Sequence, residues 1–281
     1  MSTKIEYADE TLNPFAGCSP CSPGCENCYA AEIASGRFLK DHPLYKGLAV
    51  NGKWTGEVRT CFDIDRPDIL DLPLRWKKPK VIFWGNMGDM FHPRMEIGFL
   101  THLFDVIKQC PQYKHLILTK RPKQALKMMW GKQGSGWSYF GKGDFHKSIH
   151  FGATICNQDE ADSLIPILLR IPAAHRWLSV EPMLGPVDLW KADYPTPDGC
   201  GKQGAVTSWP GGVDRVVIGC ESGPKRRPCK IEDMINLVNQ CKAAGVPVFV
   251  KQVNINGRVS HDMSEWPEEV RIRQGWKEQE K

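Results

Sequence analysis

Four cysteines in the segment 17–30 are the residues of this sequence with the clearest potential for chemistry. They are Cys18, Cys21, Cys25 and Cys28, and proline, glycine and serine fill much of the space between them. A loop of this kind can turn several thiolates toward one point. Soft sulfur ligands select zinc, copper(I) or an iron–sulfur cluster, so the segment predicts a metal centre.

Two spacings of three cysteines are possible within this loop. Cys21, Cys25 and Cys28 give C-x3-C-x2-C, whereas Cys18, Cys25 and Cys28 give C-x6-C-x2-C. Either set would hold a [4Fe–4S] cluster with one iron open to a substrate or cosubstrate, provided that the fourth cysteine stays away. The first spacing is the one used by radical S-adenosylmethionine enzymes. Zinc is an alternative, although a four-cysteine zinc site normally pairs two C-x2-C hooks and this loop has one.

The composition is that of an ordinary globular protein. The 281 residues are 41% hydrophobic and 25% charged, which allows one large barrel or two small domains. We expect neither a membrane span nor a signal peptide, because the sequence has no long apolar run and a polar beginning. A cytoplasmic location is therefore expected, where reduced thiols favour a metal over disulfides. The formal charge of +5 permits a nucleic-acid partner without requiring one.

Apolar strands alternate with helices along most of the chain. Such a rhythm is typical of a parallel α/β sheet, and with six or seven units it predicts a whole or partial (β/α) barrel in a single domain, 1–281. We expect an insertion over 187–212 and a polar, irregular tail over 254–281. The expected strands are 57–64, 80–85, 115–119, 149–155, 177–180, 213–220 and 246–251, and the expected helices are 28–39, 95–110, 123–130, 159–170 and 231–244.

Polar side chains follow most of these strands at the point where each strand ends. In a barrel the carboxyl ends of the strands form one rim, and that rim carries the active site. Charged residues also end strands simply because strands end at the surface, so each residue has a structural alternative. The strand-end residues are Asp89, Lys120, Asn157, Glu181, Glu221 and Lys251.

Six longer motifs occur in order along the chain and together resemble a phage-associated family of radical-SAM-like proteins. The resemblance runs from Thr11 to about Trp276. It implies Cys18, Cys25 and Cys28 as cluster ligands. The family usually has a residue other than cysteine at the position of Cys21, so Cys21 is the alternative first ligand. The motifs are LNPFAGCSPCSPGCENCYA (12–30), GNMGDMFHP (85–93), LTKRP (118–122), IPAAHRWLSVEPMLGPVDL (171–189), VIGCESGPKRRP (217–228) and VPVFVKQ (246–252).

The resemblance implies a radical SAM barrel whose cluster cleaves S-adenosylmethionine, so that the resulting radical abstracts hydrogen from a substrate. Flavodoxin or ferredoxin would supply the electron. The backbone of Gly85, Asn86, Gly88 and Asp89 would then line the methionine amino group.

Further roles on the rim are implied in the same way. Lys120 would pair with the methionine carboxylate, and Asn157 or Glu181 would hold the ribose. Glu221 and Lys251 would face cofactor or substrate. The structural alternative for each is an ion pair inside the barrel. Two strand-end cysteines are candidate hydrogen donors, or else small buried hydrophobes: Cys156 and Cys220, the latter where the family tends to have glycine.

The substrate implied for phage members is a modified thymine in DNA, on which an isomerase would move the attachment of an amino acid. A phage-encoded protein would work in the host cytoplasm. A run of basic residues would suit contact with DNA phosphates, and three aromatic side chains would suit the binding of a base flipped out of the duplex. Two alternatives are a radical lyase repairing pyrimidine lesions and a non-enzymatic zinc protein that binds nucleic acid. The basic and aromatic residues are Lys225, Arg226, Arg227, Trp130, Trp137 and Tyr139.

Overall fold

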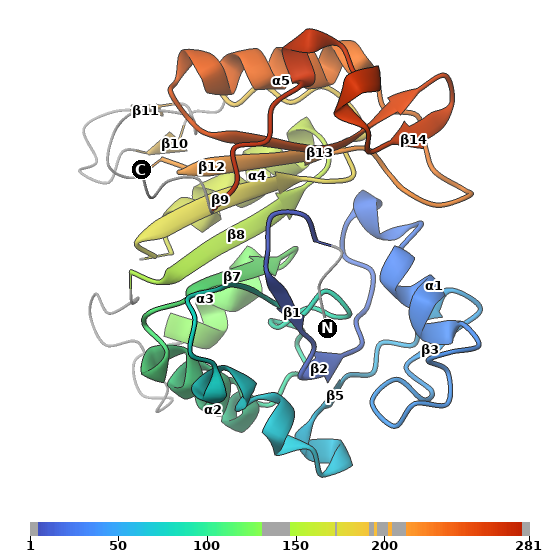
Figure 1. The fold of residues 1–281 in the computed structure, drawn as a ribbon, viewed down its shortest axis with the longest axis vertical. Coiled ribbons are helices and arrows are strands. Elements are labelled where there is room, and N and C mark those ends of the chain that lie inside the picture. Colours follow the sequence, from blue (N-terminus) through green and yellow to red (C-terminus); the bar gives the residue numbers. More distant parts are fainter. Residues whose placement is uncertain are drawn as a thin grey trace. The chain divides into compact units, whose positions relative to one another are not determined.

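The chain folds as two compact units with parallel strands and helices in both. The computed structural model describes residues 5–130, 147–171, 173–190, 194–195, 202–203 and 212–276. Unit 1 comprises Met1–His150 with Pro172–Ala174, and unit 2 comprises Phe151–Ile171 with His175–Lys281. Figure 1 labels most of the helices and strands of both units.

Unit 1 is built on three parallel strands, β1 (Glu10–Leu12), β6 (Val81–Trp84) and β7 (Lys114–Thr119). β6 pairs with β1 on one side and with β7 on the other. All four residues of β6 are buried, as expected for a strand of a parallel sheet that is covered on both faces. This burial explains why its sequence, VIFW, is continuously apolar.

Helix α2 (Ile97–Gln109) connects β6 to β7 and contributes much of the apolar core of unit 1. Helix α3 (Pro122–Trp130) follows β7 directly. The apolar residues of α2 recur every three or four positions, so that one face is buried. Its buried residues are Phe99, Leu100, Leu103, Phe104, Val106 and Ile107.

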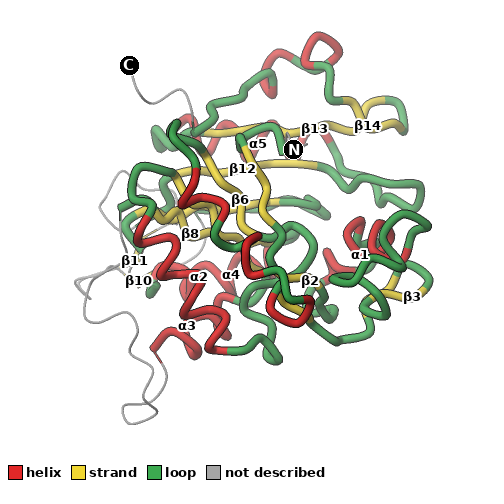
Figure 2. The backbone as a smooth tube through the Cα atoms, turned by 60° about the horizontal axis from the view of Figure 1, so that its bottom comes forward, coloured by secondary structure: helices red, strands yellow, loops and turns green. Residues whose placement is uncertain are grey.

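Short elements surround the cysteine loop in unit 1, and Figure 2 shows long loops around them. Helix α1 spans Tyr29–Ser35 and ends at Gly36, before the expected end at residue 39. The strand expected over 57–64 is limited to β5 (Arg59–Thr60). The other short elements are β2 (Phe15–Ala16), paired with β5; β3 (Ala49–Val50), paired with β4 (Lys53–Trp54); and the 3-10 helices Pro23–Cys25, Phe62–Ile64, Pro67–Ile69 and Leu72–Arg75.

Unit 2 contains the parallel strands β9 (His175–Val180), β12 (Arg215–Gly219) and β13 (Val248–Ile255). β12 lies between the other two. Strand β8 (Ile149–Ile155) belongs to unit 2 from Phe151 onward and neighbours β9. Its helices are α4 (Gln158–Leu169) and α5 (Ile231–Ala243).

The end of the chain is more regular than the sequence indicated. β13 continues to Ile255 and pairs antiparallel with β14 (Arg258–Ser260), with two 3-10 turns after it, at Met263–Glu265 and Glu268–Val270. The expectation of an irregular tail from residue 254 was therefore wrong. Asn256 and Gly257 both have positive φ, which is the geometry of a tight two-residue hairpin turn.

Most of the expected insertion at 187–212 lies outside the described residues, apart from the short pair β10 (Tyr194–Pro195) and β11 (Lys202–Gln203). Among the described residues, no helix has both the length and the apolar character needed to cross a membrane. The order of strands and helices is compatible with a (β/α) barrel, and the barrel stays a prediction.

Candidate functional site

The cysteine loop is fixed against the loop that follows β6 by a close approach of two glycines. Gly17 and Gly88 form a parallel bridge, and the Gly17 N–H donates to the Met87 carbonyl at 3.1 Å. A Cβ on Gly88 would lie 2.8 Å from the Gly17 carbonyl oxygen, so the two backbones can meet only where a side chain is missing. This contact therefore fixes the backbone position of Cys18, which follows Gly17.

Gly85 has a different reason to be glycine. Its φ is +76°, and a Cβ there would overlap the ring of Phe15. The Gly85 N–H donates to the Leu12 carbonyl at 2.7 Å, and the Asn86 N–H donates to Asn13 Oδ1 at 2.9 Å. These contacts hold the start of the loop after β6 against the segment that leads into the cysteines.

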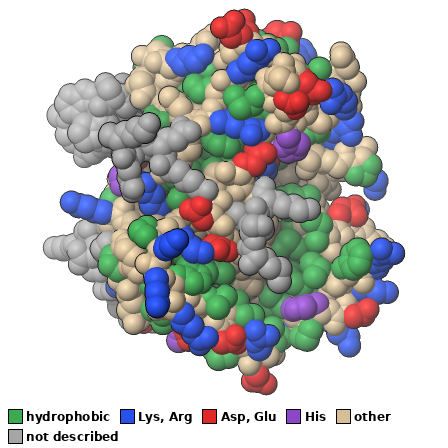
Figure 3. Space-filling model, viewed as in Figure 1, with side chains coloured by type: hydrophobic (Ala, Val, Ile, Leu, Met, Phe, Trp, Pro, Cys, Tyr) green, Lys and Arg blue, Asp and Glu red, His purple; other side chains and the backbone are tan. Residues whose placement is uncertain are grey.

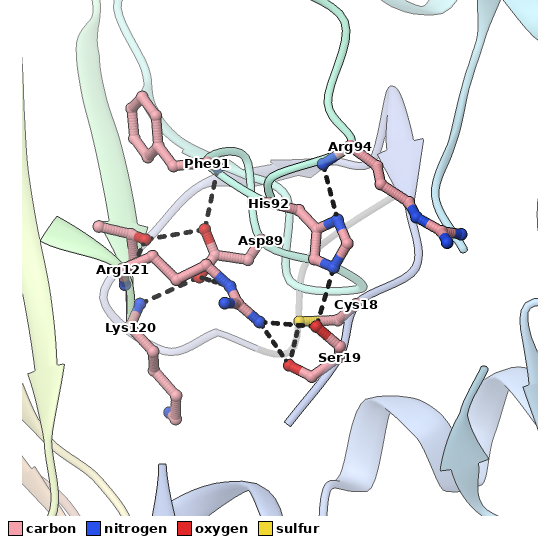
Figure 4. A network of polar contacts seen from close by, with 9 residues as sticks. Cys18, Ser19, Asp89, Phe91, His92, Arg94, Lys120 and Arg121 are labelled. Atoms are coloured by element: carbon pink, nitrogen blue, oxygen red, sulfur yellow. Dashed lines mark hydrogen bonds and ion pairs between the residues drawn. The ribbon is translucent and has the colours of Figure 1, made fainter. Parts of the chain in front are cut away.

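Asp89 organises the ends of β6 and β7. Asp89 is 6% exposed, and its carboxylate accepts from the Thr119 hydroxyl at 2.7 Å and from the Phe91 and Lys120 N–H groups at 3.0 and 3.1 Å. Arg121 Nε lies 4.0 Å from Asp89 Oδ2. Figure 4 shows this carboxylate at the centre of the polar network. Asp89 thus ties the loop after β6 to the end of β7.

Arg121 connects this network to the cysteine loop. Its Nη2 donates to the Ser19 carbonyl at 2.6 Å and to Ser19 Oγ at 2.9 Å, and its side chain also hydrogen-bonds the Cys18 thiol. The Lys120 side chain extends away from these contacts in Figure 4. Burial lowers the pKa of Arg121, but the neighbouring thiols and Asp89 outweigh it and raise the pKa above its usual value. A permanent cation therefore lies beside Cys18.

His92 supports Ser19 from the other side. Its Nδ1 accepts from the Arg94 N–H at 3.2 Å, so in the neutral ring Nε2 carries the proton and donates to Ser19 Oγ at 2.9 Å. Burial and the positive charge of Arg121 lower the pKa of His92, which favours this neutral form. Sequence reasoning missed both His92 and Arg121, although each lies inside a recognised motif.

Three of the four cysteines of the loop interact in the structure. The Cys21 and Cys25 side chains are hydrogen-bonded, and this bond raises the pKa of Cys21 while it lowers that of Cys25. Burial and then Asp89 raise the pKa of Cys18 to about 12, with Cys25 contributing as a nearby charge. Cys28 packs instead against the hydrophobic cluster that contains Ala30, Ala34 and Met87. In the described residues no three Cys, His, Asp or Glu side chains are arranged to hold a metal ion.

The donor set nevertheless fits a sulfur-ligated cluster. The loop supplies four thiols between Cys18 and Cys28, and soft sulfur ligands are typical of iron–sulfur or zinc sites. Two buried polar atoms in the loops around it, Asn86 Oδ1 and Arg121 Nε, have no hydrogen-bond partner in the described part of the chain. Buried polar groups normally have partners, so these atoms indicate room for a further group at this site.

The remaining predicted residues lie in unit 2, where several have structural contacts. Asn157 caps helix α4 by accepting from the Glu160 N–H at 3.0 Å. Glu221 is buried and accepts from the backbone and guanidinium of Arg227 at 2.5–3.0 Å. Arg226 donates to the Gly223 and Gly257 carbonyls. Arg226 and Arg227 of the expected basic run are therefore engaged within the protein.

The two candidate hydrogen donors of unit 2 are buried thiols. Cys156 is 0% exposed and Cys220 is 1% exposed. Burial, followed by the charge of Glu181, raises the pKa of Cys220 to about 12, so this side chain carries its S–H proton at neutral pH. Trp137 and Tyr139 lie outside the described residues, and Trp130 is the last residue of α3.

A family model described as "Protein of unknown function (DUF5131)" matches residues 2–273. The chain belongs to this family. The match covers both units and every motif of the sequence analysis. No curated protein and no solved structure matches the DUF5131 chain in the comparisons made with each.

Proposed function

We propose that this DUF5131 protein is a radical S-adenosylmethionine enzyme whose [4Fe–4S] cluster is held by Cys18, Cys25 and Cys28. The observation that carries the proposal is the packing of the cysteine loop on the loop after β6, through Gly17 and Gly88. This contact brings two motifs of the family resemblance, the first around the cysteines and the second around Asp89, into one site. When bound, the cluster and its cosubstrate would supply a carbon-centred radical for hydrogen abstraction.

Cys18 is favoured over Cys21 as the first ligand by its surroundings. Cys18 is partly buried and follows the glycine bridge, and Arg121 contacts it, whereas Cys21 is exposed. A positively charged, partly buried side chain stabilises a thiolate. Arg121 would thus favour the deprotonated form of Cys18 and hold Ser19 in place.

The loop after β6 would bind the amino acid part of the cosubstrate. Asn86 Oδ1 is a buried acceptor without a partner among the described residues, and an ammonium group is a suitable donor for it. The Tyr29 hydroxyl donates to the Asn86 carbonyl at 3.2 Å and so ties this loop to the start of α1. Asp89 would act indirectly, by fixing the loop.

The proposed substrate is a modified thymine base in DNA, and the proposed reaction is an isomerisation. The support is the family resemblance together with two candidate hydrogen donors, the buried Cys156 and the buried, protonated Cys220. On the face that Figure 3 presents, Lys and Arg are interspersed with Asp and Glu. This face therefore offers no single basic stripe in support of nucleic acid, and the proposal depends on recognition of the base.

The deciding experiment is anaerobic purification followed by iron and sulfide analysis and an assay for 5′-deoxyadenosine with S-adenosylmethionine and dithionite. The proposal expects about four irons per chain and cleavage of the cosubstrate. Serine variants of Cys18, Cys25 and Cys28 should lose both the iron and the cleavage of the cosubstrate. The matched control is Cys229→Ser, which replaces a partly buried thiol of unit 2 and should keep both. Bound zinc without iron after reconstitution would refute the proposal and favour the metal-stabilised binding protein.

A further inference from the structure

A buried carboxamide in unit 2 has an acceptor without a partner. Gln252 of β13 is 1% exposed, and its Nε2 donates to the Cys220 carbonyl at 2.7 Å and to Glu181 Oε1 at 3.1 Å. These two acceptors fix the orientation of the amide, because the flipped group would place its oxygen against both. Oε1 therefore faces elsewhere, and it has no hydrogen-bond partner in the described residues. Buried acceptors of this kind are rare in folded proteins.

Gln252, in the middle of β13, is part of a polar cluster at the carboxyl ends of the parallel strands β9 and β12. Glu181 directly follows β9, Cys220 directly follows β12, and Lys251 precedes Gln252 in β13. Lys251 Nζ donates to Glu181 Oε1 at 2.5 Å. Ligand sites of parallel sheets lie beyond the carboxyl ends of strands, so this position is where a site is expected.

An irregular register brings two consecutive side chains to one carboxylate. Ile218 is opposite Val250, but Gly219 is opposite Gln252, so Lys251 has no partner residue on β12. Neighbours along a regular strand point to opposite faces, and a bulge can re-aim one of them. The shift explains how Lys251 and Gln252 both reach Glu181.

Gly219 leaves the space that the cluster occupies. A Cβ at this position would lie 3.0 Å from Gln252 Nε2 and 3.2 Å from Glu181 Cδ. Any side chain would therefore press on both groups. The glycine thus lets the strand and the two polar side chains approach closely.

The charges of the cluster favour a neutral ligand. Lys251 and Glu181 compensate each other, and their side chains are 22% and 20% exposed, so the pair is partly accessible. A further charge would be only partly hydrated and would lack a partner, which is costly. Lys251 has three N–H donors, of which one is used by Glu181. The cluster therefore offers an acceptor, Gln252 Oε1, and a donor, Lys251 Nζ, on consecutive residues whose side chains both contact Glu181 Oε1.

We propose that this cluster binds the imide edge of a pyrimidine base of the thymine or uracil type. The N3–H group would donate to Gln252 Oε1, and a neighbouring carbonyl would accept from Lys251 Nζ. Cytosine held in the same position presents an unprotonated N3 to the Gln252 oxygen, and its donor on this edge, the N4 amino group, is displaced by one position. This inference deepens the proposed function, and it rests on that proposal for the substrate class.

The test measures binding of fluorescent single-stranded oligonucleotides to the full chain by anisotropy, without cosubstrate or reductant. The inference expects oligothymidylate to bind at least about tenfold tighter than oligodeoxycytidylate, the range of one well-made base contact. An oligomer of 3-methylthymidine, which lacks the N3–H, should lose this preference on the unaltered protein. Equal binding of all three oligomers would overturn the inference.

Two variants locate the effect. Gln252→Met keeps the length of the side chain and removes the acceptor, so it should abolish discrimination between thymidine and 3-methylthymidine. Gln109→Met makes the same change on the exposed surface of α2 and should leave the discrimination intact. If Gln252→Met still discriminates, the site lies elsewhere and the inference fails.

The outcome is distinguishable from failure of the proposed function, because binding and iron content are measured separately. If the protein prefers thymine but forms no cluster, the base site is supported and the proposal of a radical enzyme is refuted. If the protein cleaves the cosubstrate but shows no base preference, only the proposed base site is refuted.

Discussion

Gly88 meets Gly17 so closely that a Cβ on Gly88 would lie 2.8 Å from the Gly17 carbonyl oxygen. The contact joins the cysteine loop to the end of β6 through backbone alone. Because backbone atoms cannot move aside as the end of a flexible side chain can, the first substitution to make is Gly88→Ala.

We expect Gly88→Ala to cost about 1–3 kcal/mol of unfolding free energy, as other overpacking changes do, and to lower the iron content of the purified protein. Gly98→Ala is the matched control, because Gly98 lies in α2 with no atom within 4 Å of an added Cβ. It should be neutral or stabilise by up to about 1 kcal/mol. Thermal unfolding and iron analysis check both, and equal behaviour of the two variants would contradict the role of the bridge.

Arg121→Lys should weaken the hold on the cysteine loop although it keeps the charge. The guanidinium binds both oxygens of Ser19 through one nitrogen and the Cys18 thiol as well, and an ammonium cannot reproduce that geometry. We expect a loss of about 1–3 kcal/mol and a lower iron content. Arg94→Lys is the control, because Arg94 is 59% exposed in its ion pair with Glu57 and exposed pairs contribute little. Unchanged cluster loading in Arg121→Lys would show that positive charge alone suffices.

Serine replacements distinguish the two possible ligand sets of the cysteine loop. If Cys18 is the first ligand, Cys18→Ser should lose the iron–sulfur absorbance and Cys21→Ser should keep it. The exposure of Cys21 and the contact between Arg121 and Cys18 underlie this expectation. The opposite pattern would assign Cys21, and loss in both variants would indicate a four-thiolate centre.

A buried thiol of α5 should make stability depend on alkaline pH. Burial raises the pKa of Cys241 to about 12, from 9.0. The contribution of this thiol to the free energy of unfolding is fully present below pH 9, where the thiol is protonated in both the folded and the unfolded state. It is lost as pH rises toward 12, because the unfolded chain releases the thiol proton first. The loss approaches about 1.4 kcal/mol per pH unit above pH 9.

Denaturant unfolding at pH 8 and pH 10 measures this dependence. Cys241→Ala is less stable at both values because it leaves a cavity, but its stability should fall less between them than that of the unaltered protein. Other alkaline groups affect both proteins equally, so the difference between the two falls is the quantity to compare. A fall of the same size in both proteins would contradict the assignment to Cys241.

Strands β6, β8 and β12 could be predicted from the sequence because a short, largely apolar run is typical of a strand buried on both faces of a parallel sheet. Helix α1 was predicted too long, since Ile33 and Phe38 fit the helical spacing while Gly36 ends the helix; both side chains are in fact exposed. The hairpin of β13 and β14 had a usable signal in Asn256-Gly257, which was overlooked. Turn chemistry thus contained information that hydrophobic spacing did not.

The candidate site was predictable only in part. Motifs at strand ends pointed to Asp89 and Lys120, because a strand end is a local feature of the sequence. The partners of Ser19, namely Arg121 and His92, depend on which loops meet in space, and no local pattern reports this. Asn157 shows that a strand-end position alone does not identify a binding residue, since a cap at a helix start also follows a strand end. Gln252 was missed because an unpartnered oxygen is visible only once its neighbours are placed.

The contact between Ser19 and Arg121 spans 102 residues of sequence, and this separation has a consequence for assembly in the cell. The cysteine loop leaves the ribosome long before Arg121 does, so during synthesis the thiols are exposed on a segment that lacks its fixing contacts. In the proposed enzyme, delivery of iron and sulfide would therefore act after unit 1 has folded. A cell that makes this protein would then need its cluster-delivery machinery for the finished chain, and anaerobic handling would matter from the first minutes of expression.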